Sequence, residues 1–471
     1  MRAALYEADA DLLPRTSVKI ERTFTSTADG GAEIDADGAF AEVVAVIDAV
    51  LEKPKNIKAE IECVASCAFW HSLVGVDAKG RPTTKVFGWA DRRSREYSAV
   101  LKERFDEAAV HNRTGAHFHS SFWPAKMLWL RKEFPDAFAR TTKWLSFSDY
   151  VALRLFGAPV TSASMASGTG IFDIRKCDWD AELLRYLRVR RASLPEIAVS
   201  DATFKLSTKF AKRWPRLASA KWFPGIADGA ADNIGSGCVT RGTAALMVGT
   251  SGAMRVAYAG EPPASIPNGL FCYRIDRKRI VLGGALSDGG NLYQKLIKEL
   301  KVPRNAADEM RRRGAAAHGI SCMPFFFGER STGYHESAVG AFLDTASSHD
   351  SVDLLQSAME AIAYRFAAIW QRLRRVVKVK RVAASGGALR ESDVWTQIIA
   401  DVLGHDLMLG EVAESSSRGA VLLALESLGK IEAIENFETP VRESLAYHPE
   451  CHTAYKAARE RHEVYYKKFF E

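Results

Sequence analysis

The chain lacks the cysteine pattern of a disulfide-bonded or zinc-bound protein. Its seven cysteines are an odd number, and no later pair matches the short spacing of Cys63 and Cys67. Disulfide frameworks and zinc sites need cysteines at repeated short spacings, so neither is expected. We interpret Cys63 and Cys67 as small residues packed in the core on a strand.

Long hydrophobic runs are also missing. No stretch of about 18 consecutive apolar residues occurs, so no transmembrane helix is predicted. The N-terminal residues MRAALYEADADLLPR contain no apolar core of the length that a signal peptide needs. These absences predict a cytoplasmic protein with no membrane partner.

Basic residues are plentiful but do not gather beside aromatic ones. The formal charge is +7, and the clusters lie at Arg311–Arg313 and Arg372–Arg381. The second cluster, RLRRVVKVKR, reads as the end of a helix that leads into a strand. Because single-stranded nucleic acid is bound on aromatic platforms within a basic groove, we expect no nucleic-acid partner. A mildly basic chain is compatible with an anionic small substrate.

The patterns that are present alternate between strand and helix. Apolar residues at helical spacing predict a helix over Phe40–Leu51, and strict alternation predicts a strand over Ile57–Ser66. At 471 residues this mixture predicts two α/β domains, with a glycine-rich hinge around Gly225–Gly242. The other predicted elements are strands at Arg2–Tyr6, Ser17–Arg22, Ala244–Val248, Ala253–Tyr258 and Arg381–Ala384, and helices at Val352–Leu373 and Val394–Leu403.

Two features within Gly225–Gly252 indicate phosphate chemistry. Asp232 lies among Gly and Ala residues, which leave room for a ligand beside its carboxylate. The strand that follows ends in the turn Gly249–Gly252, whose N–H groups and hydroxyls could converge on a phosphate. Two plain alternatives remain at this point, because Asp232 could be an ordinary helix N-cap and the turn an ordinary hairpin.

Six motifs in the right order resemble the FGGY-type carbohydrate kinases, a family that includes gluconokinase, xylulokinase and glycerol kinase. Within that family, His111–Leu130 and Gly283–Tyr293 resemble the gluconokinase branch most. One motif departs from its pattern, since Trp123 stands where Pro, Ser or Thr is usual. The six are Trp89–Arg93, Lys126–Leu130, Gly229–Gly235, Gly249–Gly252, Gly328–Arg330, and Ser385–Ala388 followed by Trp395, Gln397 and Asp401.

The resemblance implies a fold and a domain plan. Two ribonuclease-H-like domains, of the actin/hexokinase-like ATPase type, would enclose a cleft. A sugar-binding domain would cover residues 1–240 and a nucleotide-binding domain residues 241–435. Residues 436–471 would form a C-terminal helical extension, and a homodimer is possible.

The resemblance also implies a reaction, in which ATP with Mg2+ phosphorylates a hydroxyl of a sugar or sugar acid, gluconate-like or a ketopentose. Asp232 would be the general base, and no residue is assigned to the metal. A surface salt-bridge cluster in ADRRSRE is the plain alternative, above all for Arg92 and less for Asp91, and a structural role is the alternative for His71. The sugar side would comprise Trp70, His71, Trp89, Asp91 and Arg93, and the ATP side Arg2, Gly249, Thr250, Ser251, Gly252, Ser385, Gly386, Gly387 and Ala388.

One departure from the family concerns its first motif, a strand and D-x-G-T turn that precede an arginine. Here Arg2 matches that arginine, and the sequence starts at Met1. We therefore expect a first domain that is N-terminally truncated. This expectation keeps a second hypothesis open, in which the chain is a catalytically impaired ATP- and sugar-binding regulator or a truncated gene product.

Overall fold

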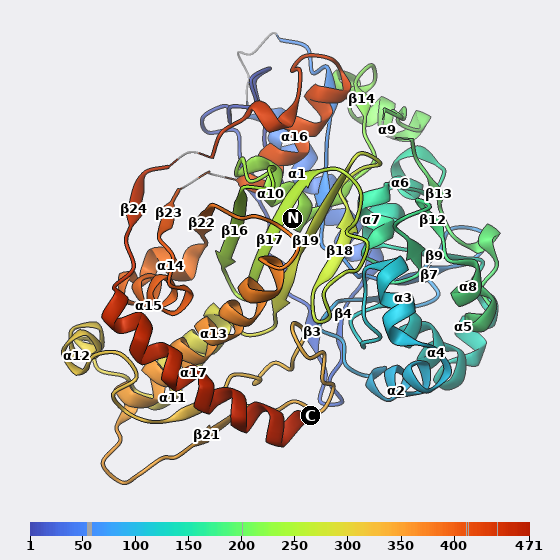
Figure 1. Ribbon diagram of the computed structural model, residues 1–471. Coiled ribbons are helices and arrows are strands. Elements are labelled where there is room, and N and C mark those ends of the chain that lie inside the picture. The colour runs from blue at the N-terminus through green and yellow to red at the C-terminus, as the bar shows by residue number, and fades with distance from the viewer. Residues whose placement is uncertain (54–58, 200, 411, 413, 440) are drawn as a thin grey trace.

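The structure is a computed structural model that describes residues 1–53, 59–199, 201–410, 412, 414–439 and 441–471. Strands and helices alternate along the chain, which confirms the α/β prediction (Figure 1). The two halves differ in their sheets, because the second half builds one large sheet and the first half several small ones.

The large sheet has seven strands, with β16 (Thr243–Val248) at its centre. β16 is antiparallel to β17 (Gly252–Ala259) and parallel to β22 (Arg381–Ser385), so all three strands predicted in this half are confirmed. Nearly every residue of β16 and β17 is buried, as expected for strands covered on both faces. The full order is β18 (Phe271–Arg274), β19 (Arg279–Leu286), β17, β16, β22, β23 (Leu407–Leu409) and β24 (Glu443–Leu445).

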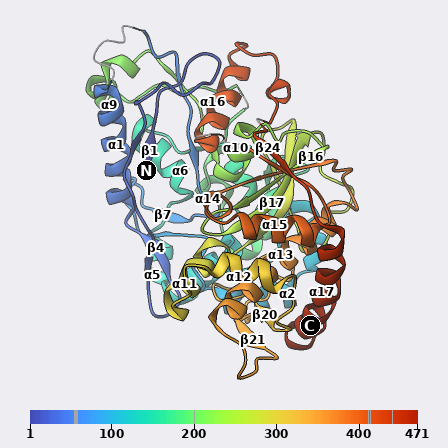
Figure 2. The ribbon, with the colours of Figure 1, turned by 90° about the vertical axis from the view of Figure 1, so that its left-hand side faces the viewer.

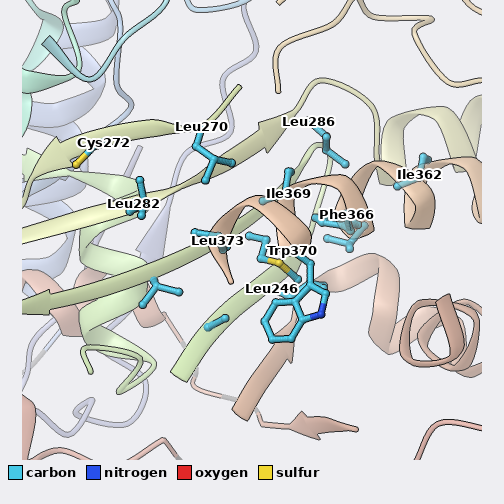
Figure 3. Packing of buried hydrophobic residues seen from close by; sticks show 14 of the residues in the cluster. Leu246, Leu270, Cys272, Leu282, Leu286, Ile362, Phe366, Ile369, Trp370 and Leu373 are labelled. Carbon is cyan, nitrogen blue, oxygen red and sulfur yellow. The ribbon is translucent and has the colours of Figure 1, made fainter. Parts of the chain in front are cut away.

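The long helix α13 (Ser351–Leu373) covers one face of this sheet and confirms the helix predicted there. Figure 3 shows Ile369 and Trp370 of α13 packed near Leu246 of β16. A Cβ added to Gly252 would lie 2.7 Å from the Phe366 ring, so α13 presses directly on the start of β17. The packing of α13 against the sheet therefore supports the turn between β16 and β17.

The remaining elements of the second half surround α13 and the sheet. The helix predicted over Val394–Leu403 is confirmed as α15 (Asp393–Leu403). Residues 436–471 contain the expected helix, α17 (Pro449–Phe470), but also β24, the outer strand of the large sheet. The others are α11 (Gly290–Leu300), α12 (Ala306–Arg313), β20 (Ser321–Met323), β21 (Ala341–Leu343), α14 (Gly387–Glu391) and α16 (Ser415–Ser427).

The first half wraps helices around short paired strands, and Figure 2 shows its helices α1 (Ala36–Glu52) and α9 (Thr208–Arg213) to one side of the large sheet. The predicted helix over Phe40–Leu51 is confirmed within α1 (Ala36–Glu52). The other helices are α2 (Arg95–Arg104), α3 (Glu107–Thr114), α4 (Trp123–Glu133), α5 (Pro135–Arg140), α6 (Phe147–Phe156), α7 (Ala163–Ser167), α8 (Ala181–Leu187), α9 (Thr208–Arg213) and α10 (Asp228–Gly235). The paired strands are β1 (Arg2–Ala3) with β2 (Val18–Lys19), β3 (Thr25–Ser26) with β4 (Ala32–Ile34) and β8 (Val86–Phe87), β5 (Cys63–Val64) with β14 (Lys221–Trp222), β6 (Cys67–Ala68) with β15 (Ile226–Ala227), β7 (Val74–Val76) with β9 (Lys143–Leu145), β10 (Val160–Thr161) with β13 (Glu196–Ile197), and β11 (Phe172–Asp173) with β12 (Asp178–Trp179).

The prediction of one long strand over Ile57–Ser66 is wrong. Its first two residues lie outside the described residues, and only Cys63–Val64 pairs, because the partner β14 offers two residues. The strands predicted over Arg2–Tyr6 and Ser17–Arg22 are also shorter than expected, because β1 and β2 each pair over two residues. Within the described residues, β1 pairs with β2 alone, and no strand joins it to β5 or β6.

No helix in the described part of the chain is both long enough and apolar enough to cross a membrane.

Candidate active site

The turn between β16 and β17 is a tight hairpin that receives the start of α11. Val248 lies opposite Gly252, so Gly249, Thr250 and Ser251 form the turn, with Thr250 exposed. The Gly290 N–H donates to the Gly249 carbonyl at 2.8 Å. The turn and the N-terminus of a helix therefore share one edge of the sheet, an arrangement that favours anions.

A second glycine turn lies beside the first. Met247 of β16 lies opposite Ser385 of β22, so Gly386 follows directly after the neighbouring strand. Gly386 has φ of +113°, and a Cβ there would lie 2.2 Å from the Val248 carbonyl oxygen. Only glycine fits this position, and Gly387 then begins α14.

Three segments without bulky side chains thus meet at one end of the sheet: 249–252, 289–290 and 386–388. A Cβ on Gly290 would lie 2.6 Å from the Gly249 oxygen and 3.2 Å from the Ala388 Cβ. Bare backbone at two helix N-termini fits the phosphates and ribose of a nucleotide. The structure therefore brings together the predicted ATP-side residues, except Arg2.

Arg2 makes its side-chain contact with a different segment from these turns. It is on β1, and its Nη1 contacts the carboxylate of Glu414, the residue that precedes α16. Its role in ATP binding stays a prediction.

Trp70 and His71 lie among buried aromatic side chains beside α10. The Trp70 Nε1–H donates to the Ser164 carbonyl at 2.9 Å, and a Cβ on Gly229 would lie 2.5 Å from the Trp70 ring. Burial lowers the pKa of His71 to about 3, so its ring is neutral. His71 Nδ1 bonds the Gly168 carbonyl oxygen, which can only accept, so Nε2 is left as an acceptor.

Asp232, the predicted general base, has both carboxylate oxygens occupied. Its Oδ2 accepts from Arg255 Nη2 at 2.7 Å, and its Oδ1 accepts from Ser415 Oγ at 2.6 Å. Arg255 comes from β17 and Ser415 from α16, so the carboxylate joins three elements. Each carboxylate oxygen therefore already has a hydrogen-bond donor from another element of the protein.

Asp228, four residues earlier, begins the same helix and is less constrained. Its hydrogen bond among the described residues comes from the neighbouring Gly229 N–H, at 2.7 Å. Burial raises the pKa of Asp228 to about 6, although the Gly229 bond and the Arg255 guanidinium oppose the rise. A carboxylate that titrates near neutrality beside an aromatic wall can act as a general base.

Asp91 and Arg93 form hydrogen bonds and ion pairs with each other and with neighbouring residues. Asp91 is 1% exposed, and Arg93 donates to it through Nε at 3.1 Å and Nη2 at 2.5 Å. Arg93 Nη2 also meets Glu33 Oε2 at 2.6 Å, and its guanidinium lies 4.9 Å from the Trp129 ring centroid. The pair therefore fixes the loop that carries Trp89, which favours the salt-bridge alternative.

Trp89 lines a cavity between the two halves of the chain. Arg330, of the Gly-Glu-Arg motif, places its guanidinium 4.2 Å from the Trp89 ring centroid. Arg330 Nη2 donates to the Leu286 carbonyl at 2.8 Å, whereas its buried Nε has no partner among the described residues. The cavity is lined from the first half by Trp89, Arg92, His119, Ser120 and Ser121, and from the second by Ser287, Phe327, Gly328, Arg330 and Glu336.

Sequence reasoning assigned no site role to Asp228, Asp288, Arg255 or Arg330. Asp288 is buried, accepts from the Phe327 N–H at 3.2 Å, and has its pKa raised to about 8 by burial. The available signals were the first Asp of the ADGAAD segment, the Asp within Gly283–Tyr293 and the Gly-Glu-Arg motif. Whether these residues face the cavity between the two halves depends on contacts with residues far along the chain, which the local sequence does not show.

Comparison with known proteins identifies the two halves of the chain. The N-terminal domain of the FGGY family of carbohydrate kinases matches residues 1–216, and the C-terminal domain of that family matches residues 244–428. A gluconokinase of Bacillus subtilis (strain 168) is 26% identical over 391 residues, which cover 80% of this chain and 76% of that protein. A xylulose kinase of the same organism is 24% identical over 427 residues, 89% of this chain and 83% of that protein.

Solved structures show the same fold. The gluconate kinase from Lactobacillus acidophilus superposes with a TM-score of 0.89 at 24% identity, covering 99% of this chain and 95% of that one. The Plasmodium falciparum glycerol kinase with ADP superposes with a TM-score of 0.83 at 17% identity, covering 100% and 96%. The expected two-domain ATPase fold is therefore confirmed.

Proposed function

Because the chain belongs to the FGGY family of carbohydrate kinases, whose members phosphorylate sugars or sugar acids with ATP and Mg2+, we propose that its acceptor is a sugar acid of the gluconate type. Two observations support the acid over a ketopentose. Gluconokinases are among the similar proteins, and Arg330 offers a guanidinium with no carboxylate paired to it among the described residues. A planar guanidinium suits bidentate recognition of a carboxylate.

The observation that carries the mechanism is the contrast between the two aspartates of α10. We assign the base to Asp228, whose carboxylate would accept the proton of the attacking hydroxyl. Asp232 is then a positioning residue that holds Arg255 and Ser415 in place. Arg255 is three residues beyond Gly252, about 10 Å along an extended strand, so this network lies close to the phosphate turn.

On the acceptor side, the Trp70 ring offers a flat face for sugar C–H groups, and His71 Nε2 offers an acceptor for a hydroxyl. Trp89 and Arg330 would close the opposite wall. Asp91 and Arg93 keep Trp89 in place and do not touch the sugar in this proposal.

On the nucleotide side, the three glycine segments would hold the phosphates and ribose through backbone N–H groups. Mg2+ supplies charge neutralisation when bound, and it is commonly held by phosphates and one or two carboxylates. Asp288 fits that role best, because it precedes the Gly289–Gly290 segment that packs on the turn. Its two oxygens receive only N–H donors in the bonds described.

ADP release tests this function directly, with D-gluconate, D-xylulose and glycerol as acceptors. We expect turnover on gluconate to exceed that on both neutral acceptors. Arg330→Met should raise the KM for gluconate much more than the KM for ATP. Arg241→Met, which removes a guanidinium stacked on Tyr258 of β17, is the matched control.

Other outcomes of the same assay would contradict the proposal. Faster turnover on xylulose than on gluconate would overturn the assignment of a sugar acid as the acceptor, although the protein would still be a carbohydrate kinase. ATP binding without ADP release on any acceptor would favour the impaired regulator.

We further propose that the protein works in a reducing compartment such as the cytoplasm, and that it forms a homodimer. The seven cysteines, all described, are all free thiols, which suits a reducing environment. The dimer stays a prediction, to be checked by light scattering after gel filtration.

A further inference from the structure

The start of the C-terminal helix α17 lies against α15 through three side chains that can each bind a metal. Asp401 comes from α15, His448 directly precedes α17, and Cys451 lies in its first turn. One ligand atom from each lies within 4.8 Å of the other two. The sequence shows no such cluster, because Asp401 is separated from the other two by β23, α16 and β24.

Asp401 is a buried carboxylate with weak charge compensation. It is 4% exposed, and its ion-pair partner among the described residues is the His448 imidazole, at 3.4 Å. Its Oδ1 accepts from the His448 N–H at 2.7 Å and from Gln397 Nε2 at 2.8 Å, whereas the contact of Oδ2 within the described residues is with His448 Nδ1, at 3.4 Å. A buried charge without a full partner is costly, and a cation beside Oδ2 would relieve that cost.

The three donors match the preferences of one class of ion. Thiolate, imidazole and carboxylate together suit zinc and similar transition metals, not Mg2+ or Ca2+. Zinc–ligand bonds of about 2.0–2.3 Å at tetrahedral angles place ligand atoms roughly 3.3–3.8 Å apart. The His448 side chain is 52% exposed, so it can rotate to close the present spacing and leave the fourth position open to water.

We propose that Asp401, His448 and Cys451 form a site for a zinc-type divalent transition metal that fastens α17 to α15. The far end of α17 is tied to the active-site cavity, since the Tyr466 hydroxyl donates to Glu329 Oε1 at 2.7 Å and Glu329 precedes Arg330. The metal would therefore stiffen a helix that braces the cavity wall.

The proposal predicts stoichiometric binding of Zn2+ alone to the chelator-treated full chain. Competition with a chromophoric chelator should give one ion per chain, and Co2+ should give a thiolate charge-transfer band. Cys451→Ser and His448→Ala should each weaken Zn2+ binding by about tenfold or more, and Cys451→Ser should abolish the band. Zn2+ should raise the melting temperature of the wild type and not that of either variant.

Cys63→Ser is the matched control, because Cys63 is a half-buried free thiol on β5, in the first half of the chain. It should bind Zn2+ like the wild type. Melting without metal shows whether each variant is folded, and His448→Ala changes a mostly exposed side chain, so one variant remains interpretable. Equal Zn2+ affinity in the wild type and Cys451→Ser, or a Co2+ complex without the band, would overturn the proposal.

Discussion

At the scale of single residues, the site depends on which of two aspartates is left unpaired. Asp228 and Asp232 are four residues apart, so they share one side of α10 and one small-residue setting. The pattern that points to a base therefore applies to both. Arg255 and Ser415 decide between them, and neither contact can be read from the local sequence.

The titration of Asp228 gives a first prediction. A base must be ionised to accept a proton, and burial raises the pKa of Asp228 to about 6. We expect kcat/KM to be low near pH 5, to rise through about pH 6 and to level off above it. Asp232→Asn should keep this profile in whatever activity remains. A pH–rate series on both proteins checks it, and a profile flat from pH 5 to 8 would contradict the assignment.

Asp91 gives a second prediction, concerning stability. Asp91→Asn removes the charge of a buried carboxylate that faces Arg93, and because Glu33 still pairs with Arg93 we expect the loss of a hydrogen bond to a charged group, about 1.5–3 kcal/mol. Urea unfolding should show that loss, whereas Asp77→Asn, at the exposed pair with Arg81, should leave the unfolding midpoint nearly unchanged. An unchanged unfolding midpoint together with lost sugar affinity would restore Asp91 as a sugar ligand.

At the scale of elements, the sequence pattern predicted those helices and strands whose type and length depend on residues close together in the chain. The helix α13 and the strands β16, β17 and β22 were predicted to within two residues, because the helix is a long apolar-rich segment and each strand a short one bounded by glycine or charged residues. The strand over Ile57–Ser66 was predicted too long, because alternation indicates exposure of alternate side chains but not the length of the partner. That partner, β14, lies more than 150 residues along the chain and pairs over two residues.

The turn after β22 gives a third prediction. Gly386→Ala places a Cβ 2.2 Å from the Val248 oxygen at a φ of +113°, so the turn must shift. We expect at least a tenfold loss of ATP affinity by calorimetry, with gluconate binding retained. Gly242→Ala is the control, because it lies outside the site just before β16, a Cβ there would be 4.0 Å from its nearest neighbour, and its φ is not positive. Equal ATP affinities in the two variants would remove this turn from the nucleotide site.

At the scale of the whole molecule, the cleft requires both halves of the chain. The nucleotide turns lie on the large sheet of the second half, while Trp70 and Trp89 come from the first. The glycine turns were predictable because glycine marks positions where backbone geometry is demanding. The charged partners were not, because their pairing is decided by contacts such as Arg330 with Trp89.

The most direct test of the account compares turnover by Asp228→Asn and Asp232→Asn under saturating ATP and gluconate. We predict that Asp228→Asn binds both ligands with normal affinity and loses about 10²–10⁴-fold in kcat. Asp232→Asn should keep kcat within about tenfold and lose stability, because it breaks the pair with buried Arg255. If Asp228→Asn turns over at the wild-type rate while a folded Asp232→Asn is inactive, the central claim is contradicted and Asp232 is the base.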